Sequence, residues 1–98
     1  METFEDIRIV EKESLVDMKF TKEDVLLNDD VKKRLRGIYL TKAETLGNNF
    51  KEKVKLFFKT ASNEICAVET TIWQANEEHV TLKGGINVPT KAVCAVEF

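Results

Sequence analysis

Residues 53–98, KVKLFFKTASNEICAVETTIWQANEEHVTLKGGINVPTKAVCAVEF, decide the fold class of this 98-residue chain. Apolar and polar residues alternate through much of this stretch, which is the pattern of β-strands that bury one face. Turn-forming residues interrupt the alternation at 61–64, 75–78 and 84–85, and Pro89 ends the fourth run. The pattern predicts five short antiparallel strands, at residues 54–59, 65–74, 79–83, 86–88 and 92–98.

A helical pattern precedes the strands. Asn28, Asp29 and Asp30 offer capping oxygens and negative charge at a helix start, and Gly47-Asn48 offers a left-handed stop. These signals predict a helix over residues 29–46. Its apolar face, at helical spacing, is expected to consist of Val31, Leu35, Ile38, Tyr39 and Leu46.

Together these elements predict an α+β fold. A flat five-stranded sheet would expose two long edges, so we expect the helix to pack on a small five-stranded antiparallel SH3/Sm-like β-barrel or strongly curved sheet. Residues 21–98 are expected to form this single domain. Residues 1–20 are acidic and show no clear periodicity, and we expect an N-terminal arm that is mobile except where Phe4, Ile9 or Phe20 docks.

Several phrases carry a resemblance to known proteins: VKKRLRGIY (31–39), VKLFFK (54–59), AVETTIW (67–73) and VTLKGGINVP (80–89). Over residues 28–98 the chain resembles a family of small bacterial proteins of the Bacteroidetes type, and this resemblance implies no particular activity. The order of helix, strands, Pro turn and last strand is also similar to that of Sm-like and SH3-like barrels. Several of those barrels bind RNA or a protein partner, so the similarity leaves both kinds of partner open.

The composition argues against membrane and secreted classes. The longest apolar run, Ala92–Val96, has five residues, whereas a membrane-spanning helix needs about 20. The N-terminal residues show neither the basic start nor the apolar stretch of a signal peptide. We therefore expect a cytoplasmic protein with no membrane contact.

The residues that could support catalysis or bind a metal are sparse. Cys66, Cys94 and His79 make three cysteine or histidine ligands in total, and a structural zinc site normally uses four. Both cysteines are expected to be free, buried thiols. No glycine-rich phosphate-binding loop is present, and a nucleophile would have to be activated by the only histidine. The sequence therefore predicts no enzyme, no catalytic residues, no metal and no cofactor.

Charge is segregated along the chain. Residues 1–30 carry ten acids and four bases, residues 31–59 carry nine bases and two acids, and residues 60–98 have a balance of −3. Either the acidic segment folds beside the basic one and neutralises it, or the basic segment meets an anionic partner. The candidate binding residues are Lys32, Lys33, Arg36, Lys55, Phe57, Lys59 and Trp73.

Phe57 and Trp73 fall on the polar faces of their strands, so alternation alone does not bury them. Flanked by lysines, they could form a stacking platform for single-stranded nucleic acid or an anchor for a protein. The other reading is that the helix covers both rings with Leu35, Ile38 and Tyr39. The primary hypothesis is a non-enzymatic protein–protein interaction module, and the alternative is a barrel that binds RNA or single-stranded DNA. The sequence leaves the oligomeric state open.

Overall fold

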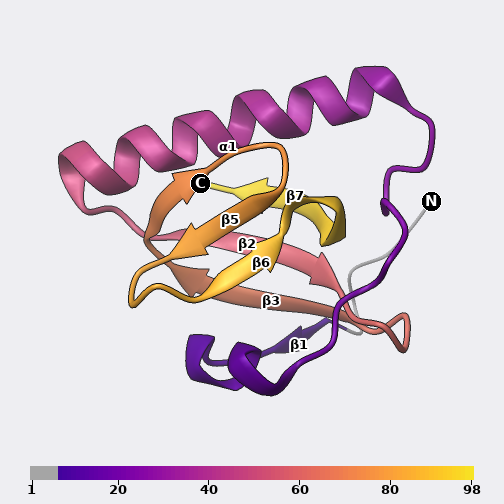
Figure 1. Ribbon diagram of the computed structural model, residues 1–98. Coiled ribbons are helices and arrows are strands. Elements are labelled where there is room, and N and C mark those ends of the chain that lie inside the picture. The colour runs from indigo at the N-terminus through magenta and orange to yellow at the C-terminus, as the bar shows by residue number, and fades with distance from the viewer. Residues whose placement is uncertain (1–6) are drawn as a thin grey trace.

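In the computed structural model, which describes residues 7–98, the chain is α+β, as predicted, with one long helix and seven strands in the described part (Figure 1). The helical elements are the α-helix α1 (Asp30–Phe50) and the 3-10 helices η1 (Lys12–Asp17) and η2 (Thr90–Ala92). The strands are β1 (Arg8–Ile9), β2 (Val54–Lys59), β3 (Ile65–Thr70), β4 (Ile72–Ala75), β5 (His79–Leu82), β6 (Asn87–Pro89) and β7 (Val93–Glu97).

The strands form two sheets, of four strands in the order β1-β3-β2-β7 and of three in the order β4-β5-β6. Every pairing is antiparallel except that of β1 with β3. The predicted strand at 54–59 is confirmed, but the predicted strand at 65–74 is divided into β3 and β4. Thr70, Thr71 and Ile72 are all buried. Alternation therefore fails within β3, where Cys66, Ala67 and Val68 are all buried, and again at Thr71, where the chain leaves one sheet and enters the other.

The structure does not confirm the predicted five-stranded barrel, because neither sheet formed by residues 7–98 closes on itself. Pro89 ends β6 as expected, since proline has no N–H to donate to a ladder. The short helix η2 then carries the chain across to β7, which pairs with β2 rather than with β6. The result is two partly open layers, with α1 along one side and β1 with η1 along the opposite side (Figure 1).

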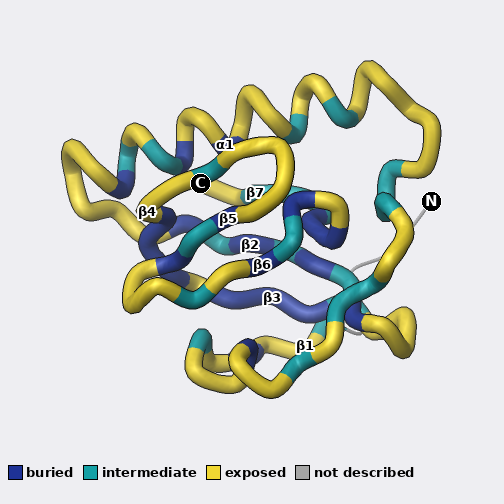
Figure 2. Tube along the Cα trace, viewed as in Figure 1, coloured by how far each residue is buried: buried dark blue, intermediate teal, exposed yellow. Residues whose placement is uncertain are grey.

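The hydrophobic core lies between the two layers, where Figure 2 shows the dark blue segments of the strands. Along β2, Val54, Leu56 and Phe58 are buried, whereas Lys55, Phe57 and Lys59 on the other face are half-buried. Burying a side chain of Leu or Phe size stabilises a fold by about 1.5–3 kcal/mol. The largest enclosed side chains are Leu40, Leu56, Phe58, Val68, Ile72, Val80, Leu82, Val88 and Val93.

Residues 7–20 pack against the sheets over much of their length, which differs from the expected arm. β1 pairs with β3, Val10 donates its N–H to the Ala67 carbonyl at 2.9 Å, and Leu15 is 2% exposed. Phe20 meets Phe58 edge to face at 5.5 Å. Val10 and Leu15 belong to the common core, so residues 7–20 share a core with residues 21–98. A two-residue strand and a 3-10 helix leave no periodic signal in the sequence; Phe4 lies outside the described residues.

Helix α1 extends to Phe50, four residues beyond the predicted end. Gly47 lies inside the helix, where it is buried against β4. A Cβ at this position would collide with the Ile72 carbonyl oxygen and lie 3.0 Å from the Thr71 methyl group. The left-handed residue that ends the helix is Lys51, at φ 55°. Gly47 therefore permits a close approach of helix to strand, and the prediction that it stops the helix is wrong.

The predicted apolar face of α1 is also wrong. The buried residues of the helix are Leu40, Ala43 and Gly47. Val31 is 70% exposed, Leu35 42%, Ile38 55% and Tyr39 45%. The helix thus packs through Leu40 and two small residues, Ala43 and Gly47, and the stripe of Val31, Leu35 and Ile38 is exposed, where Figure 2 shows a largely yellow tube.

Two glycines of one helix give opposite predictions for the same substitution. Gly47→Ala lowers the free energy of unfolding by about 1–3 kcal/mol, because the added methyl group displaces β4. Gly37→Ala raises it by up to about 1 kcal/mol, because a Cβ there has no atom within 4 Å and alanine favours the helix. Urea unfolding of the wild type and both variants measures the two changes in the free energy of unfolding. Equal effects at the two positions would contradict the close contact of α1 with β4.

Candidate functional site

The first candidate surface is the outer face of α1, defined here as Val31, Leu35 and Ile38. At 3.6 residues per turn, these three positions lie about 140–180° around the helix from the buried Leu40. Tyr39 lies beside the outer face, and its ring meets the Phe98 ring at 6.2 Å. The Lys42 ammonium lies 4.4 Å from the centre of that second ring. The helix is therefore apolar on two opposite sides, of which one is buried against the sheets and the other is largely exposed.

Arg36, predicted to bind a partner, instead holds the first half of α1 to the rest of the fold. Its guanidinium donates to both carboxylate oxygens of Asp24, at 2.9 and 2.8 Å, and to the Val93 carbonyl at 3.2 Å. The Arg36 side chain is 8% exposed. Its charge is thus compensated by an acid of the N-terminal segment, which supports the neutralisation alternative at this position.

The Asp24 carboxylate stays ionised because of this contact. Partial burial by itself raises the pKa of Asp24. The hydrogen bonds from Arg36 and the Leu26 N–H, with the charges of Arg36 and Lys33, outweigh burial and hold the pKa below its ordinary value of 3.8.

The other predicted binding residues are not gathered at one place. Lys32 and Lys33 lie on α1, Lys55, Phe57 and Lys59 on β2, and Trp73 on β4, where it is 46% exposed. Phe57 lies on β2 in the four-stranded sheet, whereas Trp73 lies on β4 in the three-stranded sheet. The structure therefore does not bring Phe57 and Trp73 together as a platform. It does not cover them with Leu35, Ile38 and Tyr39 either, because those three side chains are exposed.

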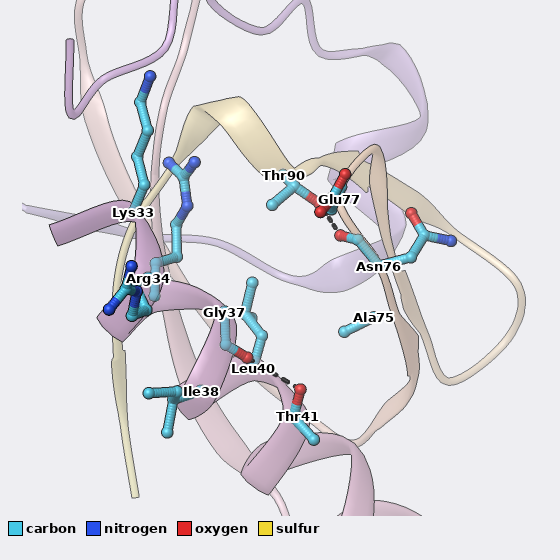
Figure 3. Close-up of a pocket in the computed structure, with 11 residues that line it drawn as sticks. Lys33, Arg34, Gly37, Ile38, Leu40, Thr41, Ala75, Asn76, Glu77 and Thr90 are labelled. Atoms are coloured by element: carbon cyan, nitrogen blue, oxygen red, sulfur yellow. Dashed lines mark hydrogen bonds between the residues drawn. The ribbon is translucent and has the colours of Figure 1, made fainter. Parts of the chain in front are cut away.

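The second candidate surface is an open cleft of about 710 Å³ between the first half of α1 and the loops at the end of the three-stranded sheet (Figure 3). Leu40 of the helix and Ala75 of β4 form the apolar floor of the cleft. Lys33 and Arg34 lie on the helix wall, and Glu77 lies on the facing turn. Its volume falls within the range of known ligand sites. The lining residues are Lys33, Arg34, Arg36, Gly37, Ile38, Leu40, Thr41, Ala75, Asn76, Glu77 and Thr90.

Local hydrogen bonds hold both walls of the cleft in place. On the helix side, the Glu44 carboxylate accepts from the Ala75 N–H at 2.7 Å. On the facing side, the Asn76 side-chain oxygen accepts from the Glu78 and His79 N–H groups, and the Thr90 hydroxyl donates to the Asn76 carbonyl. These bonds use polar groups of the walls for the fold itself. The chemistry left for a ligand is the apolar floor and the charges of Lys33, Arg34 and Glu77.

Sequence reasoning missed this cleft. The one signal of the cleft in the sequence is Gly37, because a glycine in mid-helix costs about 1 kcal/mol relative to alanine and so requires close packing, a bend or another reason. The structure shows neither close packing nor a break in α1, because the position faces open space.

A smaller groove of about 220 Å³ lies on the other side of α1, against β7. Among residues 7–98, β7 is an edge strand with a paired neighbour, β2, on one side only. Arg36, held by Asp24, lines this groove. The other residues that line the groove are Leu26, Lys32, Leu35, Tyr39, Cys94, Ala95 and Val96.

The cysteines of the described part are free, as expected. Cys66 is buried, whereas Cys94 is half-buried. Burial, and then the hydrogen bond and charge of Glu64, raise the pKa of Cys66 to about 11, so this thiol is protonated at neutral pH. Within residues 7–98 no three or more His, Cys, Asp or Glu side chains cluster as a metal site would require. The same residues contain no helix with the length and hydropathy to cross a membrane.

No family model, curated protein or solved structure matches this chain. The resemblance to a Bacteroidetes-type family and to Sm-like and SH3-like barrels therefore stays a hypothesis. The surfaces of α1 are the basis for any statement about function.

The Asp24–Arg36 contact predicts how stability depends on pH. Because folding lowers the pKa of Asp24, its contribution is complete above pH about 4 and is lost as the pH falls through the lowered pKa. We expect Asp24→Asn to cost about 1–3 kcal/mol at pH 7, since hydrogen bonds to a charged group are lost. That cost should shrink between about pH 4 and pH 2.

Urea unfolding at a series of pH values measures this difference. Asp17→Asn is the matched control, because Asp17 is exposed and belongs to no ion pair of the described residues. A cost of Asp24→Asn that stays constant down to pH 2 would contradict the role of the charge.

Proposed function

We propose that this protein is a non-enzymatic protein-interaction module whose partner packs on the outer face of α1. The observation that carries the proposal is the exposure of Val31, Leu35 and Ile38 on a helix that already contacts the core through its opposite side. Apolar side chains at positions i, i+4 and i+7 are the pattern by which helices bind grooves or other helices. Val31 and Ile38 stay more than half exposed in the folded chain, and a partner is the most direct explanation for this apolar surface.

The charges around the outer face suit a protein surface of negative potential. α1 contains five basic and two acidic residues. Of the five bases, Arg36 is held by Asp24. The remaining four lie around the helix among the apolar side chains. Opposite charge on the partner would speed its approach and orient it.

The nucleic-acid alternative has less support. It relied on Arg36, whose charge is already paired with Asp24, and on a joint surface of Phe57 and Trp73, which lie on strands of different sheets. It also relied on Lys55 and Lys59 acting together with the helix lysines, yet these lie half-buried on a separate element. Single-stranded nucleic acid binding combines a continuous basic groove with stacked aromatic rings. The described surface lacks that combination.

The test places a photo-crosslinking amino acid at Leu35 and, as a control, at Ser62 in an exposed turn. We expect cross-linked protein from the cell of origin at position 35 and none at position 62. Combining the Leu35 probe with Val31→Ser and Ile38→Ser should reduce the yield about tenfold or more, since apolar contacts are lost. The free energy of unfolding should change by less than about 0.5 kcal/mol, because both residues are exposed.

Two results would contradict the proposal. One is cross-linking that persists unchanged in the serine variants. The other is tight binding of a random single-stranded RNA or DNA pool that weakens steeply with salt and is lost in Lys32→Glu/Lys33→Glu. The second result would establish the nucleic-acid alternative instead.

A further inference from the structure

We propose that the cleft beside Gly37 is the pocket that receives a short acidic segment of the partner protein, with one apolar side chain inserted between the walls. This inference rests on the proposed function and adds the chemistry of the partner. In it, the apolar side chain lies over Leu40 and Ala75, and a neighbouring carboxylate pairs with Lys33 and Arg34 at the helix end of the cleft (Figure 3).

The cleft is open because Gly37 has no side chain. Beyond the helix's own backbone and the adjacent residues, an added Cβ would have no atom within 4 Å, although Leu40, one turn later, is 2% exposed. The helix therefore leaves its own backbone uncovered above an apolar floor. Glycine is the least favourable helix residue apart from proline, at about 1 kcal/mol relative to alanine. The residue thus costs stability without serving close packing, whereas Gly47 in the same helix is needed for contact with β4.

The charges around the cleft select an acidic occupant. Among the described residues, the ion pairs are Arg8–Glu64 and Asp24–Arg36, so Lys33 and Arg34 are in neither. The carboxylate near Lys33, that of Asp24, is already bonded through both oxygens to Arg36. On the facing wall Glu77 is exposed. The helix end of the cleft is thus positive and the far wall negative, which gives a bound segment a direction.

A protein segment also follows from the position of Ile38. This residue lines the cleft and belongs to the outer face of α1, so the two surfaces are continuous. A partner packed on Val31 and Leu35 can extend a neighbouring segment around Ile38 into the cleft. The apolar insertion supplies binding energy, and the carboxylate supplies selectivity.

The variant that tests the pocket should also strengthen the fold. Gly37→Leu fills the cleft from the helix side, has room for its Cβ, and replaces a poor helix former by a good one. Thr45→Leu is the matched control, since it adds the same side chain to an exposed position of α1 outside the cleft. Urea unfolding should show Gly37→Leu to be at least as stable as the wild type, so any lost binding is not lost folding.

The probe is a library of displayed random octapeptides selected on the full chain. We expect wild type and Thr45→Leu to enrich peptides in which Asp or Glu neighbours a single Leu, Ile, Met or Phe. Gly37→Leu should lower the affinity for these peptides at least about tenfold, a loss of about 1.4 kcal/mol of binding free energy. Lys33→Glu/Arg34→Glu should lose the acidic preference and select basic peptides instead. NMR shifts on peptide addition should centre on Gly37, Ala75 and Asn76.

The inference is overturned if the enriched peptides show no acidic preference or bind Gly37→Leu as well as wild type. It is also overturned if the chain forms a dimer that Gly37→Leu dissociates, because a second copy would then be the occupant. If cross-linking at Leu35 succeeds while the cleft selects nothing, the proposed function stands and the pocket fails. If selection on the cleft succeeds while Leu35 yields no cross-link, the pocket stands and the outer face fails.

Discussion

The contact between Gly47 and the backbone of Ile72 determines how α1 lies on the sheets. Only a residue without a Cβ lets the helix come this close to β4. Once that side faces the strand, Leu40 and Ala43 enter the core by helical spacing alone. Arg36 secures the other half of the helix by reaching Asp24 and the Val93 carbonyl. These two attachments leave the bulkier apolar stripe outside and an open space beside Gly37.

Much of the sheet architecture could be predicted, because each strand buries one face and so carries a period of two. Val54, Leu56 and Phe58 show that period without a break, and β2 lies where it predicts. The period fails at residues 66–68 of β3 and again at Thr71, where the chain passes from one sheet to the other; three successive residues are buried at each place. The choice between a closed barrel and two open sheets depends on whether β6 meets β7. No local pattern in residues 87–97 specifies that pairing.

The orientation of α1 could not be predicted from hydrophobicity, because the helix has two stripes at helical spacing. Val31, Leu35 and Ile38 carry larger apolar side chains than Ala43 and Gly47, so hydrophobicity alone places them inside. The close approach of α1 to β4 at Gly47 places Leu40 and Ala43 inside instead. The pairing of Arg36 with Asp24 was foreseen only as a general neutralisation of charge, since nothing marks which base meets which acid. Gly37 is visible in the sequence, but an open space beside a helix leaves no trace in the pattern of side chains.

The N-terminal segment bears on motion as well as on structure. β1 has two residues, and its Arg8 meets Glu64 at 3.4 Å on the surface, while the Glu64 carboxylate accepts from the Cys66 thiol. β1 is the shortest strand of the described part, and local openings of such short segments occur without unfolding of the whole domain. Cys66 lies on β3 directly beside β1. Because Cys66 is fully buried in the common core, its rate of reaction with a thiol reagent measures how often this part of β3 becomes exposed to solvent.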